Sequence, residues 1–333
     1  MPLGSNKAGL FGAAGVSGGG DRGIYAGGIA GNVAIDSIEY VTISSTGNGT
    51  DFGDMMSGGR ASGCANGADG GRGIITRGRN EDPDISYITV QTLGNAVEFG
   101  NQHVGADERG TVSNGSNDRG LFMGGYDGAR TGAIEYITVS STGNGADFGD
   151  LSAARRQPFQ AASNGTDERG ITMGGESASV GAVDIIEYVT INSAGNSTDF
   201  GDMNPIHKRG GSCSNDTNDR MVTGGGGNFG SDGNDPATTP TDNFISYITM
   251  TSTGNTTDFG NLTSGRGYPC CFSSGTDERG VWAGGYYTPD DVTYSMVDVI
   301  DYVTISSTGD ATDFGDLADN TGYDHGGLSD CQA

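Results

Sequence analysis

Hydrophobic and polar residues alternate in six short segments that match one another almost residue for residue. Each reads Ile, an acidic residue or Ser, Tyr, Val or Ile, Thr and a further apolar residue, and the six begin at Ile38, Ile85, Ile134, Ile186, Ile245 and Ile300. The two-residue period predicts β-strands, because successive strand side chains point to opposite faces. Since apolar residues occur among the side chains of both faces of each strand, we expect these strands to be buried on both faces.

Two further motifs accompany each segment. A Gly-Asn or Gly-Asp pair follows it, and then Asp-Phe-Gly or Glu-Phe-Gly, with Tyr and Phe 12 residues apart in every copy. A segment that contains Arg and ends in Gly precedes it, from residues 21–28 in the first copy to 278–285 in the last. Nearly all the length variation lies between that Gly and the next Ile, where the repeats have 9, 6, 8, 10, 18 and 14 residues. Each repeat therefore combines a fixed scaffold with one adjustable loop.

Each repeat offers four strands: a run of small residues such as 160–163, the Arg segment, the Ile-Tyr-Thr segment and the Phe segment. Four-stranded repeats of about 50 residues predict an all-β fold with almost no helix, a six-bladed β-propeller of four-stranded antiparallel blades. An open β-solenoid is the alternative and suits the long irregular loops less well. We expect a single domain, 1–333, with blades at approximately 1–55, 56–102, 103–151, 152–203, 204–262 and 263–317 and a closing strand in 318–333.

Two terminal segments read as the small-residue strand of the first blade, residues 10–15 and residues 324–329. We expect the C-terminal one to close the ring and the N-terminal one to be displaced or to extend an edge. The Gly-Asn pairs predict tight hairpins between the third and fourth strands, where residues need a positive φ.

These motifs resemble kelch repeats, which combine a small-residue strand, a Gly-Gly pair, a Tyr and a downstream aromatic residue. The chain departs from kelch in having Phe in place of Trp and a longer spacing from the Tyr. The sequence motifs EYVTI, STGN and TDFGDL, preceded by DERG, resemble repeats of virion-associated proteins from marine and cyanobacterial tailed phages. This second resemblance implies a tail-fibre, tail-associated or capsid-decorating protein on the virion surface.

The charge balance argues against nucleic acid as a partner. Asp and Glu number 42 against 17 Lys and Arg, a net charge of −25, whereas phosphate backbones attract cations. No apolar run approaches 18 residues, and the start lacks the apolar core of a signal peptide, so we expect no membrane insertion. The residues PLGS at 2–5 resemble the remnant of a protease tag.

The motifs that could suggest catalysis are better explained by structural roles in packing and in ion pairs. Asp-Phe-Gly occurs in protein kinases, but here it recurs once per repeat without the other kinase motifs, so we interpret its Phe as a packing residue. The repeated arginines are expected to bridge carboxylates, for example the Asp of a neighbouring Asp-Phe-Gly, and they are Arg22, Arg72, Arg119, Arg169, Arg220 and Arg279.

The cysteines and histidines likewise form no recognisable catalytic or metal-binding motif. An odd number of cysteines suits no closed disulfide set, and the five are Cys64, Cys213, Cys270, Cys271 and Cys331. Cys64, Cys213 and Cys271 fall on the small-residue strands, so we interpret these three as small buried fillers. The histidines lie in different repeats, at His103, His207 and His325. We therefore expect a protein that is not an enzyme.

Function is expected in the variable loops, which an up-and-down blade places on one face. The two longest loops supply candidate binding residues, namely Asn228, Phe229, Asp232, Asp235, Tyr286, Tyr287, Asp290, Asp291 and Tyr294. Aromatic rings with nearby carboxylates suit a host glycan or a neighbouring virion protein. The alternatives are a purely structural capsid decoration or adaptor protein, a secreted lectin and a propeller enzyme. The loop carboxylates also suit calcium, but without an EF-hand pattern we expect no cofactor.

Overall fold

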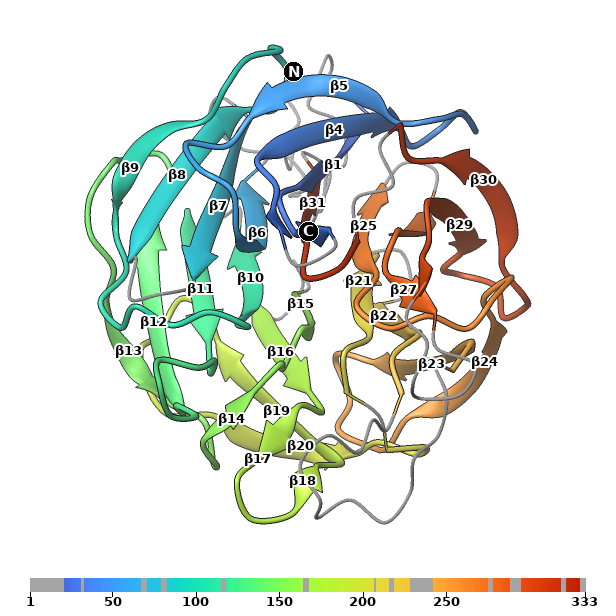
Figure 1. The fold of residues 1–333 in the computed structure, drawn as a ribbon. Helices are drawn as coiled ribbons and strands as arrows, with labels where there is room; N and C mark the ends of the chain where they lie inside the picture. Colours follow the sequence, from blue (N-terminus) through green and yellow to red (C-terminus); the bar gives the residue numbers. More distant parts are fainter. Residues whose placement is uncertain are drawn as a thin grey trace, which may run out of the picture.

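The computed structural model describes residues 21–30, 33–66, 71–78, 83–114, 118–163, 168–206, 208–215, 219–227, 242–274, 278–287, 295–318 and 322–329. Over these ranges the chain is all-β, without a helix, and its main elements are six four-stranded antiparallel sheets (Figure 1). No described segment is a helix long and apolar enough to cross a membrane. The expected fold class of an all-β protein is confirmed.

The sheets follow the repeats, and Figure 1 shows their first strands nearest the centre. In order from the centre outward they are β31 (Gly326–Ser329), β1 (Arg22–Ala26), β4 (Ser37–Thr42), β5 (Thr50–Asp54); β6 (Arg60–Asn66), β7 (Arg72–Gly78), β8 (Asp84–Thr89), β9 (Val97–Asn101); β10 (Gly110–Asn114), β11 (Arg119–Met123), β12 (Ala133–Thr138), β13 (Ala146–Asp150); β15 (Gln160–Ser163), β16 (Arg169–Met173), β19 (Ile185–Thr190), β20 (Thr198–Asp202); β21 (Gly211–Ser214), β22 (Arg220–Gly224), β23 (Phe244–Thr249), β24 (Thr257–Asn261); and β25 (Cys270–Ser274), β26 (Arg279–Ala283), β29 (Val299–Thr304), β30 (Thr312–Asp316).

The sheets have a propeller-like arrangement around a central axis (Figure 1). Their inner strands contact one another in the order β31, β6, β10, β15, β21 and β25, and β25 contacts β31 again. The C-terminal strand β31 pairs with β1, so the first sheet combines the two ends of the described chain. Residues 326–329 of the expected C-terminal segment thus form the innermost strand of the first sheet, whereas residues 10–15 lie outside the described residues.

Neighbouring sheets pack face to face, which is why the third strands are apolar in both rows. One core cluster joins Ile24, Ile38 and Phe52 of the first sheet to Ile75 and Ile88 of the second. The Phe of each Asp-Phe-Gly is 2–3% exposed and meets the Tyr of its own sheet edge to face, with ring centroids 5.9–6.2 Å apart. The packing role predicted for this Phe is confirmed.

The Gly-Asn pairs join sheets, and the predicted hairpin geometry is wrong. Asn144 Oδ1 accepts a hydrogen bond from Asn101 N of the preceding sheet at 3.1 Å, and Gly143 N donates to Phe99 O at 2.9 Å. Side-chain bonds of the same kind recur from Asn48, Asn95, Asn196, Asn255 and Asp310. Of the six glycines in these pairs, all of them described, only Gly94 has a positive φ.

The glycine of Asp-Phe-Gly is needed because the hairpin of the next sheet closes over it. Gly149 has a φ of 153°, and a Cβ there would lie 2.3 Å from Gly195 O. Equivalent close contacts meet the other five copies, Gly53, Gly100, Gly201, Gly260 and Gly315. The motif therefore marks a backbone-to-backbone contact between sheets.

The repeated arginine also joins sheets, although its partner differs from the expected carboxylate. The Arg72 guanidinium stacks on the Tyr87 ring 4.5 Å from its centroid and donates to Val139 O of the next sheet at 3.1 Å. The other five arginines repeat both contacts with the corresponding residues. The carbonyl at the end of the neighbouring third strand replaces the Asp that we expected.

The substitution Gly149→Ala tests the contact between sheets. The new methyl group would overlap Gly195 O, so we expect the free energy of unfolding to fall by about 3 kcal/mol. The matched control is Gly143→Ala, where an added Cβ meets nothing within 4 Å and a change within about 0.5 kcal/mol is expected. Urea unfolding measures both, and equal effects would contradict the proposed role of the contact.

Candidate functional site

The structure describes two of the nine predicted loop residues, Tyr286 and Tyr287. Tyr287 is 39% exposed, whereas Tyr286 is only 4% exposed and packs in an aromatic cluster with Tyr268 and Tyr323. Of the two, only Tyr287 therefore presents its ring to solvent. The remaining seven lie outside the described residues, namely Asn228, Phe229, Asp232, Asp235, Asp290, Asp291 and Tyr294.

One side of the molecule, here called the loop face, combines two sets of connections. Because the strands are antiparallel, the loops between second and third strands emerge at the same end as the connections leading into each inner strand. Small hairpins project there, β2–β3 (Ile29–Ala30, Val33–Ala34), β17–β18 (Glu176–Ser177, Gly181–Ala182) and β27–β28 (Tyr286–Tyr287, Ser295–Met296). β14 (Arg155–Arg156), which precedes β15, pairs with β17 and ties the two sets together.

Exposed large hydrophobic side chains gather on the loop face. Among the described residues, six of eight lie on its loops: Val33, Met56, Tyr126, Val180, Ile206 and Tyr287. The other two, Leu93 and Val97, lie at the opposite end of the strands, between β8 and β9 and at the start of β9. Exposed apolar residues that collect on one side of a molecule mark an interaction surface.

Six residues at the entries to the inner strands form what we call the axial ring. They vary between repeats, with only Arg occurring twice: Arg60, Glu108, Gln157, Arg209, Tyr268 and Asp324. All except Arg60 have positive φ values, between 56° and 69°. Non-glycine residues adopt this conformation rarely, and when they do they often lie at functional sites. The repeats therefore diverge where their backbones turn in toward the axis.

The members of the axial ring contact one another directly. Arg60 forms ion pairs with Glu108 and Asp324. Arg209 Nε donates to Gln157 Oε1 at 3.0 Å, and Gln157 Nε2 donates to the Tyr268 hydroxyl at 2.8 Å. The Arg209 guanidinium also lies 5.1 Å from the centroid of the Tyr268 ring. Side chains from all the sheets thus meet around one axis.

A second polar cluster holds the neighbouring loops together. Glu176 of β17 is fully buried and accepts hydrogen bonds from Arg130, from Arg156 Nη2 at 2.8 Å and from Lys208 Nζ at 2.7 Å. Arg209 Nη1 donates to the Tyr286 hydroxyl at 3.3 Å, which connects β27 to the axial ring. The buried Tyr286 side chain therefore helps to position Arg209 in the axial ring.

Buried ion pairs support three of the repeats from inside. The acidic residue of the third strand pairs with an arginine near the entry to the inner strand, as Arg109–Glu135, Arg155–Glu187 and Arg266–Asp301. Burial lowers the pKa of each of these arginines, and the partner carboxylate opposes that shift. The second and fifth repeats have Ser86 and Ser246 at the acidic position. Sequence reading did not reveal these ion pairs, because each joins two residues that no motif connects.

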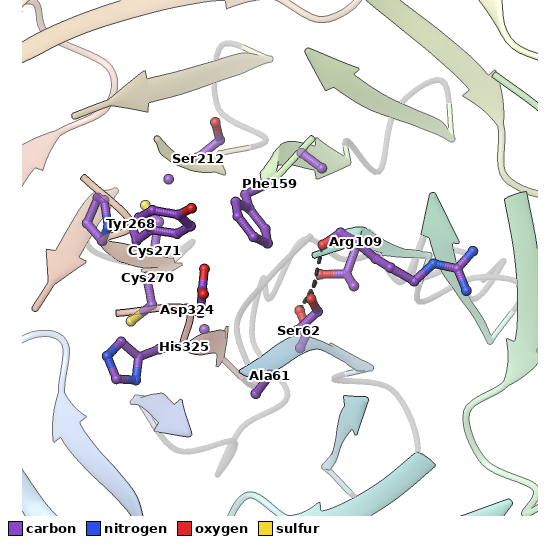
Figure 2. Close-up of a pocket in the computed structure, with 16 residues that line it drawn as sticks. Ala61, Ser62, Arg109, Phe159, Ser212, Tyr268, Cys270, Cys271, Asp324 and His325 are labelled. Carbon is purple, nitrogen blue, oxygen red and sulfur yellow. Dashed lines mark hydrogen bonds between the residues drawn. The ribbon is translucent and has the colours of Figure 1, made fainter. Parts of the chain in front are cut away.

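A cavity of about 50 Å³ lies on the axis, lined by the inner strands (Figure 2). Phe159, Tyr268, Asp324 and His325 contribute side chains to its wall. Burial raises the pKa of Asp324 to about 7, which nearby Arg60 opposes, and burial lowers the pKa of His325 to about 4. The His325 ring stacks on Tyr25, with centroids 4.2 Å apart.

The three cysteines predicted to be small buried fillers, Cys64, Cys213 and Cys271, are buried on the inner strands β6, β21 and β25. Cys64, Cys213, Cys270 and Cys271 are free and buried, and Cys331 lies outside the described residues. Burial raises the pKa of Cys64 to about 12 and also raises the pKa values of Cys270 and Cys271, so these thiols stay protonated at neutral pH. Within the described ranges no three His, Cys, Asp or Glu residues are placed to hold a metal ion.

The geometry defines a propeller-like all-β protein with a cavity on its axis and exposed hydrophobic side chains on its loop face. No protein-family model matches the chain, and no curated protein matches it in sequence.

His325 predicts a pH dependence of stability. Because its pKa is about 4 in the folded protein and about 6.5 when unfolded, only the unfolded state is protonated between these values. This stability is present above pH 6.5 and is lost as the pH falls toward 4, by about 3 kcal/mol. The variant His325→Phe keeps a ring beside Tyr25 but cannot be protonated. Urea unfolding at pH 4–7 should therefore show the stability difference between the two proteins shifting toward the variant at low pH, and a constant difference would contradict this.

Proposed function

We propose that the chain forms a closed six-bladed, kelch-like β-propeller that works as a non-catalytic binding module. Two sets of contacts between the last and first sheets support closure. Arg279 Nη1 donates to Ile43 O at 2.7 Å, and Gly47 N donates to Phe314 O at 2.9 Å. Contacts of the same kinds connect other neighbouring sheets, so the last and first sheets pack together in the same way as the others do.

The loop face is the proposed binding surface, and the gathering of exposed hydrophobic residues there is the observation that carries this proposal. Four of the six side chains are aliphatic, Val33, Met56, Val180 and Ile206. Such side chains pack well in protein interfaces. A protein is therefore the favoured partner. Tyr126 and Tyr287, which are 36% and 39% exposed, favour a host glycan as the second candidate, because sugars stack on aromatic rings.

The proposed setting is the surface of a phage virion, in a tail fibre or another surface component. It is supported by the resemblance of the repeats to those of virion-associated proteins. A purely structural capsid decoration or adaptor protein would use the same loop face to fit a neighbouring subunit. Labelling intact particles with an antibody against this chain, followed by electron microscopy, distinguishes a tail from a capsid location, and particles without label would contradict the setting.

Charge placed on the loop face tests the binding surface. The double variant Val33→Asp/Val180→Asp should weaken binding to the separated proteins of the source particle at least tenfold, because each carboxylate would lose water in the interface. The control Leu93→Asp/Val97→Asp adds the same charge at the other end of the strands and should bind normally. Binding to a protein partner is measured by overlaying the labelled chain on the separated particle proteins. Binding to a host glycan, the second candidate, is tested on a glycan array. Equal loss in both variants would contradict the assignment of the face.

A further inference from the structure

Two cysteines face each other across the interface between the fifth and sixth sheets. Cys213 lies on β21 and Cys271 on β25, and these inner strands contact each other. Both side chains belong to one buried core cluster, which also contains Trp282. The two thiols are hydrogen-bonded, and Cys213 Sγ lies 2.8 Å from the position that a Cβ on Gly280 of the sixth sheet would take. The pair therefore fills one contact between two sheets.

The directions of the side chains pair Cys213 with Cys271 and exclude the adjacent Cys270. Successive side chains of a strand point to opposite faces. Ser214 Oγ donates to Ser163 O of the fourth sheet at 2.7 Å, so Cys213 points the other way, toward the sixth sheet. Cys270 packs in a core cluster shared with the first sheet, and Cys271 packs in the cluster shared with the fifth.

Cys271 is within reach of a small oxidant. It lines the axial cavity (Figure 2) and is 8% exposed, whereas Cys213 is fully buried. A cavity of about 50 Å³ admits molecules of the size of water or hydrogen peroxide. Burial raises the pKa of the Cys271 thiol, and the hydrogen bond with Cys213 adds to this shift. Because the thiolate is the reactive form, we expect oxidation to take hours.

We propose that Cys213 and Cys271 form a reversible disulfide when a peroxide enters the axial cavity. The Cys271 thiolate attacks one peroxide oxygen, the O–O bond breaks, and a sulfenic acid and one water are formed. The Cys213 sulfur then attacks the Cys271 sulfur, the S–O bond breaks, and the Cys213 proton leaves in a second water. Two thiols are thereby oxidised, and one peroxide is reduced to two waters.

The disulfide would fasten the fifth sheet to the sixth. It closes a long loop, residues 213–271, which contains the three outer strands of the fifth sheet, β22, β23 and β24. Cross-links that close long loops stabilise a fold most, because they constrain the unfolded chain. Disulfides persist outside the reducing cytosol, so the bond would strengthen the protein there. This site does not depend on the partner proposed for the loop face.

Peptide mapping of the peroxide-treated wild type tests the pairing. After unfolding, alkylation with iodoacetamide and digestion with trypsin, peptides 210–220 and 267–279 should be joined, with Cys270 alkylated. Trp282, the only tryptophan, lies opposite Cys271 in the register of β25 and β26. Because disulfides quench tryptophan, its fluorescence should fall on oxidation and return with dithiothreitol. The urea midpoint of unfolding should rise by about 1 M and return likewise.

Variants locate the bond and supply a matched gain. Cys271→Ala should abolish the cross-link, and Cys270→Ala should keep it. The second and third sheets carry Cys64 and Thr111 at the equivalent register positions, and Thr111 Oγ1 donates to Gly63 O at 2.6 Å. Thr111→Cys should therefore gain a second cross-link, to Cys64. Separate alkylated peptides from the oxidised wild type, or a cross-link through Cys270, would overturn the proposal, and neither result requires a variant to fold.

Discussion

The contact between the hairpin of one sheet and the outer strand of the preceding sheet is the constraint on which the rest of the structure depends. An outer strand presents unpaired backbone groups, which invite aggregation unless something covers them. Here Gly143 and Asn144 bond to the backbone of β9, and the side-chain bond of Asn144 has an equivalent at every sheet. The glycine of Asp-Phe-Gly permits the close approach, as Gly149 shows against Gly195. One short motif therefore protects an edge and fixes the distance between neighbouring sheets.

The identical and variable parts of the repeat separate along the direction of the strands. Arginine stacking, the Gly-Asn bonds and the Phe packing are the same in all six sheets. The axial ring and the loops on the same face differ from sheet to sheet. A new binding surface can evolve by changes in the axial ring and the loops alone, because the repeated contacts already supply the scaffold.

Much of the fold follows from the sequence because it depends on local periodicity. The strands that Tyr40 and Phe52 occupy lie where alternation placed them, and the small residues of β15 lie at the axis, as expected. The partners of the repeated motifs were harder to predict. Arg72 bonds to Val139 and Asn144 bonds to Asn101, and both partners lie in other sheets, so no spacing within a repeat reveals them.

The candidate site was least accessible to sequence reading. Asp324, Tyr268 and Gln157 share no motif, and register alone brings them together on the axis. One signal was present, namely that the residue at the entry to the inner strand varies between otherwise repetitive units, with only Arg occurring twice. Tyr286 was predicted from its loop as a contact residue, but its hydroxyl bonds to Arg209 beneath the surface. The sequence predicts that Tyr286 lies in a loop, whereas the burial of its side chain depends on how the neighbouring sheets pack.

The asymmetry of the axial ring bears on what the cavity can bind. Six identical residues around the axis would present the same group six times and would suit a symmetric ligand or a column of water. Instead, Arg60 and Arg209 carry positive charge, Glu108 and Asp324 carry acidic groups, and Gln157 and Tyr268 are neutral. The charges are also unevenly paired, because Arg60 serves several carboxylates while Arg209 bonds to Gln157 and Tyr286. Such a ring breaks the near-sixfold repetition of the scaffold at the axis. Two of its members, Tyr268 and Asp324, also line the axial cavity, so the wall of the cavity is asymmetric as well.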